Sequence, residues 1–259
     1  MQDLENLKTA AIKAGEIALS YFDKNYKKWD KEAGAGPVTE ADLEVDNFLK
    51  TFLLNCEPTY GWLSEETEDS SSRLTKSKVF IVDPIDGTRS FIAGDKTWAH
   101  SLAIAENGIP IAAVVYLPKM ELLYTAEIGK GAFLNGTKIY IAEDAELKDA
   151  EILAKKSVLE ENIWKNDSTP LFKPIFFPSL AYRLALVAEG RFDAMVTLGR
   201  AWEWDICAGH LLVSEAGGSV TTSLGSQIKY NSKTGSSNGI LAGNSYIRQK
   251  ISDDLRDPD

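Results

Sequence analysis

The chain has 259 residues, of which 44% are hydrophobic and 25% are charged, and its formal net charge is −10. This length suffices for one large domain or two small ones that bury a core without disulfide bonds. The negative charge argues against a general nucleic-acid-binding protein and against binding to anionic membranes, because both functions need a basic face.

The cysteine content, the N-terminal residues and the length of the apolar runs indicate the cellular compartment. Two cysteines, Cys56 and Cys207, are too few for a disulfide framework and indicate a reducing environment. Asp3 and Glu5 stand where a signal peptide would carry basic residues before an apolar core. No stretch approaches the length of a transmembrane run. We therefore expect a soluble cytoplasmic protein.

Two helices are expected first. Apolar residues recur at helical spacing over Leu4–Tyr21, with Asp3 as the N-cap, and predict an amphipathic helix. The breaker Gly34–Pro37 ends this region, and Thr39 then caps a second amphipathic helix. Asp42, three residues after Thr39, is in position to be the acid of a capping box, which is one reading of its role.

A buried strand follows. The apolar run Val79–Val82 predicts a strand covered on both faces, and Pro84 is expected to end it because proline cannot donate to a ladder. The polar stretch Ser70–Lys78 before it predicts a mobile loop. Asp83 would then lie at the end of the strand, with Asp86 one tight turn later, so that both carboxylates point into one crevice.

This turn predicts a site for a cation and an anion. The two carboxylates and the Ile85 carbonyl offer the oxygen ligands that Mg²⁺ prefers, and the amides of Gly87 and Thr88 suit a phosphate oxygen. The alternative is an ordinary corner in which the two acids cap backbone amides, since Asp, Pro and Gly are common turn residues.

The rest of the chain predicts two differently built halves. Asn107-Gly108 between apolar runs predicts a hairpin, and the strands after it extend an antiparallel sheet to residue 141. The charged connector Ala142–Ala150 suggests a boundary between an N-terminal α+β half, 1–145, and a C-terminal α/β half, 146–259. In the second half, the expected strands are 152–154, 175–177, 194–198 and 239–242, and the expected helices are 180–189, 206–216 and one at the C-terminus.

A second acidic motif lies in the C-terminal half. Asp205 falls at the start of the helix predicted at 206–216, and the small residues Cys207, Ala208 and Gly209 would let a ligand approach the first turn closely. An acid at this position is more often a helix cap, so both readings stay open on these residues alone.

The order of these motifs resembles the inositol monophosphatase family of Mg²⁺-dependent, lithium-sensitive phosphatases. The resemblance runs from Pro37–Asp42 through Glu65-Glu66, Asp83–Thr88 and Trp204–Gly209 to Glu215–Gly218. It implies a layered α/β/α/β/α sandwich with the active site where the two halves meet, and most metal ligands in the N-terminal half.

The resemblance also implies roles for single residues. Glu65, Asp83 and the Ile85 carbonyl would bind a first Mg²⁺, and Asp83, Asp86 and Asp205 a second, while Glu65 would touch a third ion if one is present. Four clustered carboxylates need such cations, because like charges about 4 Å apart repel by about 4 kcal/mol per pair at an effective dielectric constant near 20.

The remaining implied roles concern catalysis and the substrate. Asp42 and Thr88 would hold the water that attacks phosphorus, and the Gly87 and Thr88 amides would hold the phosphate. The residues implied to contact the substrate are Gly87, Thr88, Asp86, Arg183 and Asp205.

The sequence motifs indicate the substrate less specifically than they indicate the family. Inositol-specific members carry an acidic residue seven positions before the aspartate of the Trp-Asp motif, and here that position is Leu198. Residues 87–92 and 186–190 look like the branch that removes the 3′-phosphate of 3′-phosphoadenosine 5′-phosphate. Arg89, Arg183 and Arg200 would then meet a second phosphate, although the default interpretation of each is a solvated surface arginine.

We therefore expect a hydrolase of inositol 1-phosphate or of a nucleotide, with 3′(2′),5′-bisphosphate nucleotidase activity as the alternative. A further alternative is a regulatory protein that binds RNA polymerase or ribosome-assembly factors, as some relatives are thought to do. Expected partners are a small phosphorylated substrate and a second copy of the chain in a homodimer, with neither membrane nor direct nucleic-acid binding.

Overall fold

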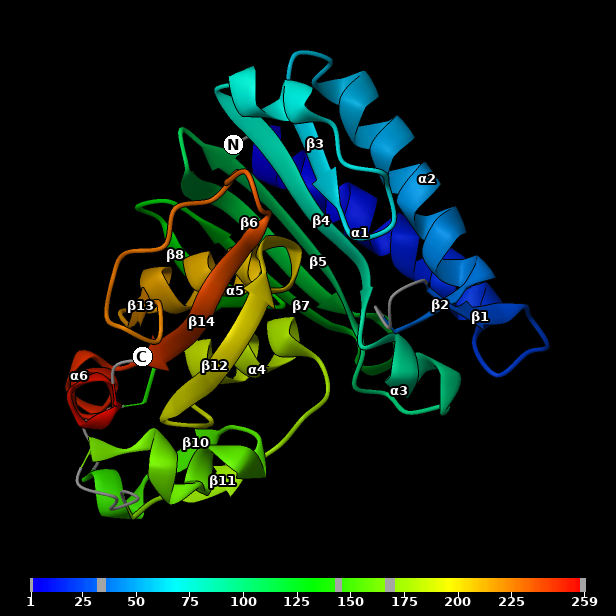
Figure 1. Ribbon diagram of the computed structural model, residues 1–259. Coiled ribbons are helices and arrows are strands. Elements are labelled where there is room, and N and C mark those ends of the chain that lie inside the picture. Colours follow the sequence, from blue (N-terminus) through cyan, green and yellow to red (C-terminus); the bar gives the residue numbers. More distant parts are fainter. Residues whose placement is uncertain (1, 32–35, 143–145, 166–170, 257–259) are drawn as a thin grey trace.

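Helices and two β-sheets alternate in layers through the molecule (Figure 1). The computed structural model describes residues 2–31, 36–142, 146–165 and 171–256. Helices α1 (Gln2–Tyr21) and α2 (Glu40–Cys56) cover one face of a seven-stranded sheet. Helices α4 (Leu180–Ala188) and α5 (Glu203–Glu215) separate it from a five-stranded sheet, whose outer face is covered by α6 (Ser245–Asp254). This arrangement confirms the predicted α+β class and the layered sandwich.

The seven-stranded sheet carries most of the acidic motifs. Its order is β3-β4-β5-β6-β7-β8-β9, and all pairs are antiparallel except β3 with β4. The predicted hairpin is confirmed, because Asn107 and Gly108 adopt positive φ values of 51° and 85° between β5 and β6. The strands are β3 (Gly61–Ser64), β4 (Lys78–Asp86), β5 (Ala99–Glu106), β6 (Ile109–Leu117), β7 (Leu122–Glu127), β8 (Gly131–Leu134) and β9 (Thr137–Ile139).

The five-stranded sheet belongs to the later part of the chain. Its order is β11-β10-β12-β14-β13, with parallel pairing of β10 to both of its neighbours and antiparallel pairing of β14 to both of its own. The strands are β10 (Glu151–Leu153), β11 (Lys173–Ile175), β12 (Ala194–Trp202), β13 (Ser219–Thr221) and β14 (Ser236–Gly243). The sheets fall on either side of the predicted domain boundary, but the division at residue 145 stays a prediction, and residues 143–145 lie outside the described part.

The smaller elements frame the site or connect the layers. A two-stranded sheet of β1 (Lys28–Asp30) and β2 (Pro37–Thr39) leads into α2, and the short helix α3 (Thr88–Ile92) follows β4. The 3₁₀ helices are η2 (Ser71–Thr75), η3 (Pro118–Met120), η4 (Leu147–Asp149), η5 (Lys156–Leu159) and η6 (Glu161–Ile163). None of the helices in the described ranges is long and apolar enough to cross a membrane.

The layers are held together by three apolar clusters. One packs α1 and α2 on the seven-stranded sheet through residues such as Leu49 and Phe80. A second surrounds α4 and α5 between the sheets, and a third lies under α6, where Trp164 is fully buried. Because α4 and α5 lie in the middle layer, their first turns meet the ends of β3 and β4, and the site forms there.

The prediction that Pro84 ends its strand was wrong. Strand β4 continues to Asp86, but its pairing register with β5 shifts between Asp83 and Asp86. The shift takes Pro84 out of the regular ladder, so its missing N–H costs no hydrogen bond. The same irregularity breaks the alternation of the strand and lets both acids face the cavity.

The polar stretch 70–78, which was predicted as a mobile loop, is partly helical and ends in the first residue of β4. This stretch contains η2, and its Arg73 is only 1% exposed. The Arg73 guanidinium donates to Asp69 Oδ1 and to Asn231 Oδ1, both at 2.6 Å. A buried, hydrogen-bonded arginine anchors the segment, and sequence polarity alone could not reveal this because Asn231 is distant in the chain.

Candidate active site

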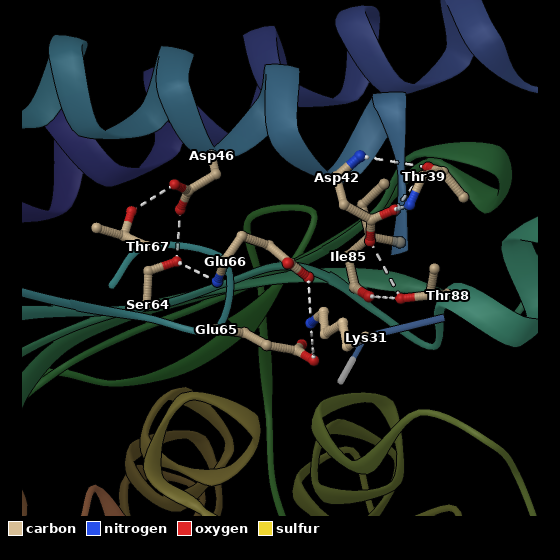
Figure 2. Close-up of polar contacts among 10 residues, drawn as sticks. All are labelled: Lys31, Thr39, Asp42, Asp46, Ser64, Glu65, Glu66, Thr67, Ile85 and Thr88. Carbon is tan, nitrogen blue, oxygen red and sulfur yellow. Dashed lines mark hydrogen bonds and ion pairs between the residues drawn. The ribbon is translucent and has the colours of Figure 1, made fainter. Parts of the chain in front are cut away.

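The first turn of α2 brings Asp42 to the site. Thr39 is the N-cap and forms the predicted capping box, with the Thr39 amide donating to Asp42 Oδ2 at 2.8 Å and the Asp42 amide to Thr39 Oγ1 at 3.4 Å. The other carboxylate oxygen, Oδ1, accepts a hydrogen bond from Thr88 Oγ1 at 3.1 Å (Figure 2). The capping role and the contact to Thr88 therefore coexist in one side chain.

Three carboxylates from separate elements meet beside this pair. One oxygen each from Glu65, after β3, Asp83, in β4, and Asp205, in the first turn of α5, lie within 4.8 Å of one another. Among the described residues, Asp83 Oδ1 is buried without a hydrogen-bond partner. Oxygen donors and an unpartnered buried oxygen fit a hard divalent cation such as Mg²⁺.

Asp86 is held differently. Its Oδ2 accepts hydrogen bonds from Ser179 Oγ at 2.6 Å and from the Ala181 amide at 2.7 Å, both at the start of α4. It lines the same cavity but lies outside the group formed by Glu65, Asp83 and Asp205. Asp86 therefore joins the seven-stranded sheet to the middle helical layer.

A cavity of about 630 Å³ opens in front of these acids. It brings together every residue expected at the site except Asp42, which lies buried behind Thr88. The expected residues that line it are Glu65, Asp83, Ile85, Asp86, Gly87, Thr88, Arg183 and Asp205.

The geometry and the sequence together identify the family. The chain matches the profile described as "Inositol monophosphatase family" over residues 1–257. The chain belongs to the inositol monophosphatase family. It is accordingly a phosphatase, which hydrolyses phosphomonoesters.

Individual relatives cover nearly the whole chain. "Inositol-1-monophosphatase" of Bacillus subtilis is 31% identical over 89% of this chain and 94% of its own. "Inositol monophosphatase 2" of Solanum lycopersicum is 30% identical over 92% of both chains. Among solved structures, extragenic suppressor protein suhB from Bartonella henselae superposes with a TM-score of 0.84 at 30% identity, covering 98% of both chains.

The pKa values of the buried acids at this site are raised. Burial, and then the Glu65, Asp86 and Asp205 charges, raise the pKa of Asp83 well above its usual range. Desolvation also raises the pKa of Asp205, and burial raises the pKa of Asp86 and of Asp42 to about 6. A cation in the cavity would lower the pKa of each carboxylate that binds it, because the positive charge favours the ionised form.

Lys31 pairs with the two adjacent glutamates at the end of β3. Lys31 Nζ lies 2.7 Å from Glu65 Oε1 and 2.7 Å from Glu66 Oε1 (Figure 2). Burial, followed by the Glu65 charge, raises the pKa of Glu66 to about 7. The lysine thus balances two adjacent acids, and sequence reasoning missed it because it lies in a polar segment far from either glutamate in the chain.

Arg183 was expected to contact the substrate, whereas most of the residues around it in the cavity were not anticipated. Arg183, read as a surface residue in one alternative, is 1% exposed, and its Nη1 has no hydrogen-bond partner within the described residues. Its guanidinium lies 5.3 Å from the Phe176 ring centroid. The residues of the wall opposite the acids that were not anticipated are Lys155, Phe176, Pro178, Leu180, Thr197, Trp202 and Trp204.

The perturbed acids predict an unusual pH dependence of stability for the metal-free protein. A carboxyl whose folded pKa exceeds its unfolded pKa binds more protons when folded, so its contribution to the free energy of unfolding falls as pH rises. In EDTA, urea unfolding should show the free energy of unfolding falling between about pH 4 and pH 6, as Asp42 and Asp86 lose the protons that their raised pKa values of about 6 retain in the folded state. Each pKa unit between the folded and unfolded states corresponds to about 1.4 kcal/mol.

Excess Mg²⁺ provides the comparison for this prediction. A bound cation favours the ionised acids, so the difference in unfolding free energy between Mg²⁺ and EDTA should widen with rising pH. A difference that stays constant from pH 5 to pH 8 would contradict the assignment of Asp86 to a cation site.

Proposed function

We propose that this phosphatase is Mg²⁺-dependent, with the carboxylates of Glu65, Asp83, Asp86 and Asp205 and the Ile85 carbonyl holding two or three ions. The observation that carries the proposal is the convergence of three carboxylates within 4.8 Å beside a buried, unpartnered Asp83 oxygen. When bound, the cations would supply Lewis-acid activation of the phosphate and lower the pKa of a water.

Asp42 and Thr88 would handle the attacking water. Thr88 Oγ1 donates its hydrogen toward Asp42 Oδ1, so its lone pairs are able to accept a hydrogen from water. Asp42 is the acceptor at the end of this relay, and Thr39 fixes its orientation from the other side. The proposed general base is thus the Asp42 carboxylate acting through the Thr88 hydroxyl.

The turn after β4 would hold the phosphate. Gly87 has φ of +99°, and a Cβ there would lie 3.3 Å from the Thr97 carbonyl oxygen, so a side chain would be strained and crowded. The Gly87 and Thr88 amides would donate to the transferring phosphate, while Asp86, Asp205 and Arg183 would contact the rest of the substrate. Phosphate release from phosphomonoesters in Mg²⁺, with EDTA and lithium as inhibitory conditions, tests the proposal.

Two substrate classes remain candidates within this proposal. The names of the Bacillus subtilis and tomato relatives support inositol 1-phosphate, a phosphorylated polyol. The opposite wall supports a nucleotide with a second phosphate, such as 3′-phosphoadenosine 5′-phosphate. This wall carries Lys155, Arg183 and Arg200, whose cations suit an anionic group. Leu198, which is outside this lining, stands at the sequence position where inositol-specific members carry an acid.

Aromatic residues on this wall add a surface for a planar group. The rings of Trp202 and Trp204 are stacked with centroids 4.8 Å apart and planes 10° from parallel. The Arg200 guanidinium lies 5.3 Å from the Trp202 ring centroid. Stacking on indole and guanidinium planes stabilises a bound nucleobase. The same planes stabilise a neutral polyol ring much less, because it has no aromatic face.

Arg200→Gln is expected to separate the two substrates. Loss of one charged hydrogen-bond donor should raise KM for 3′-phosphoadenosine 5′-phosphate about tenfold with little change in kcat. KM for inositol 1-phosphate should stay unchanged. Side-by-side phosphate-release kinetics check this, with Arg191→Gln, an exposed arginine outside the cavity, as the matched control. Equal effects on both substrates would remove Arg200 from substrate recognition.

The remaining expectations are part of the same proposal. The phosphatase would act in the cytoplasm and be inhibited by lithium. A homodimer, the absence of nucleic-acid binding and a regulatory role toward RNA polymerase or ribosome-assembly factors stay predictions without support from the described residues.

A further inference from the structure

Asp46 is a buried carboxylate that the proposed chemistry does not use. It lies on α2, four residues after Asp42, and the two side chains therefore project from the same side of the helix. Asp46 is 6% exposed and does not line the cavity. A desolvated carboxylate needs hydrogen-bond donors, so its partners indicate what it does.

The partners of Asp46 flank the two glutamates at the end of β3. Ser64 Oγ donates to Asp46 Oδ1, and Thr67 Oγ1 donates to Asp46 Oδ2 at 2.5 Å (Figure 2). Ser64 Oγ in turn accepts from the Glu66 amide at 3.5 Å, and Trp62 Nε1 donates to Thr67 Oγ1 at 3.2 Å. The Asp46 carboxylate thus accepts hydrogen bonds from the residue before Glu65 and from the residue after Glu66.

The sheet alone does not fix this turn. Strand β3 ends at Ser64, and the Glu65 amide makes a further bond to the Val82 carbonyl at 3.3 Å. Beyond that point the chain leaves the sheet. The bond from Thr67 to Asp46 then closes the turn against α2.

We propose that Asp46 is a positioning residue for Glu65, which it fixes by tying both ends of the turn to α2. The inference rests on the proposed function, in which Glu65 is a metal ligand. The same helix holds Asp42 against Thr88, so α2 would set the spacing between the pair that handles water and the turn that supplies Glu65. Asp46 itself contacts neither metal nor substrate.

Asp46→Ala tests the proposal because it leaves both hydroxyls without their acceptor. Loss of groups that orient a metal ligand typically costs about 10- to 100-fold in metal affinity. We expect the Mn²⁺ dissociation constant, measured from the free-ion EPR signal with Mn²⁺ alone, to rise about tenfold or more. The Mg²⁺ concentration for half-maximal hydrolysis should rise in parallel, with kcat at saturating Mg²⁺ nearly unchanged.

The matched control is Asp193→Ala. Asp193 Oδ2 accepts from the Glu151 amide at 2.8 Å in the other sheet, away from the cavity. Its loss should lower the melting temperature and leave the Mn²⁺ affinity at the wild-type value. Three milder variants should give intermediate Mn²⁺ affinities: Asp46→Asn, which keeps one carbonyl acceptor, Ser64→Ala and Thr67→Ala. If Asp46→Ala does not fold, these variants test the proposal in its place.

The outcomes separate this inference from the proposed function. An unchanged Mn²⁺ affinity in the folded Asp46 variants, or an equal loss in Asp193→Ala, would overturn the positioning role. Mn²⁺ binding by the wild type without hydrolysis of any phosphomonoester would overturn the proposed function, while a selective loss of affinity in Asp46→Ala would still support the positioning role. A wild type that binds no Mn²⁺ would overturn both.

Discussion

Asp83→Asn is expected to lower kcat by about a thousandfold or more, because a ligand that supplies several kcal/mol of charge stabilisation through bound cations is lost. Asp83 is 1% exposed and lies within 4.8 Å of both Glu65 and Asp205 through its ligand oxygen. The substitution also removes one charge from a repulsive group. The metal-free variant should therefore melt at a higher temperature than the metal-free wild type.

Two measurements check this prediction together. Phosphate release in saturating Mg²⁺ gives the loss of turnover, and thermal unfolding in EDTA and in Mg²⁺ gives the change in stability. Asp95→Asn is the matched control, because Asp95 lines the cavity but is exposed and lies outside the acid group. Near-normal turnover in Asp83→Asn would refute the assignment of Asp83 as a metal ligand.

Thr88→Val is expected to lower kcat by about a hundredfold, the lower end of what a positioned acid–base group contributes. Valine keeps the shape of threonine but removes the hydroxyl that donates to Asp42 Oδ1 and to the Ile85 carbonyl. The Asp42 carboxylate would then lose its link to the attacking water. KM should change little, since the phosphate is held by backbone amides in the proposed arrangement.

Thr88→Ser is the internal control for this prediction. Serine restores the hydroxyl, so kcat should return to within a few-fold of the wild-type value, as phosphate-release kinetics would show. A Thr88→Val enzyme with wild-type kcat would show that Asp42 acts without Thr88, or that it has no part in moving the proton.

Short sequence patterns predicted much of the secondary structure and the positions of Asp83 and Asp86 at the end of β4. Asp83, Ile85, Asp86 and Gly87 directly follow one apolar run in the sequence, and the structure brings them to one cavity at the irregular end of β4. Such a motif is readable because its geometry is set by neighbouring residues. The first two helices were predicted from periodicity, and the second also from its cap Thr39, whereas Asp3, the predicted cap of the first, lies inside α1. The layered fold was implied by the family resemblance.

What the sequence could not predict depends on long-range contacts. Asp86 bonds to Ser179 and to the Ala181 amide across the layers, and Lys31 pairs with Glu65 and Glu66. Arg183 was expected at the site, but its burial was not predicted, because nothing in its neighbourhood reveals that α4 is packed between two sheets. These partners are set by tertiary packing, on which local periodicity carries no information.

The origin of Asp205 on α5 has a consequence for biosynthesis. Glu65 and Asp83 leave the ribosome with the seven-stranded sheet, whereas the third carboxylate arrives only when α5 has emerged and inserted between the sheets. Domains generally fold as units from the N-terminus during translation. A nascent chain halted before α5 should therefore show sheet structure but lack the third carboxylate of the proposed cation site.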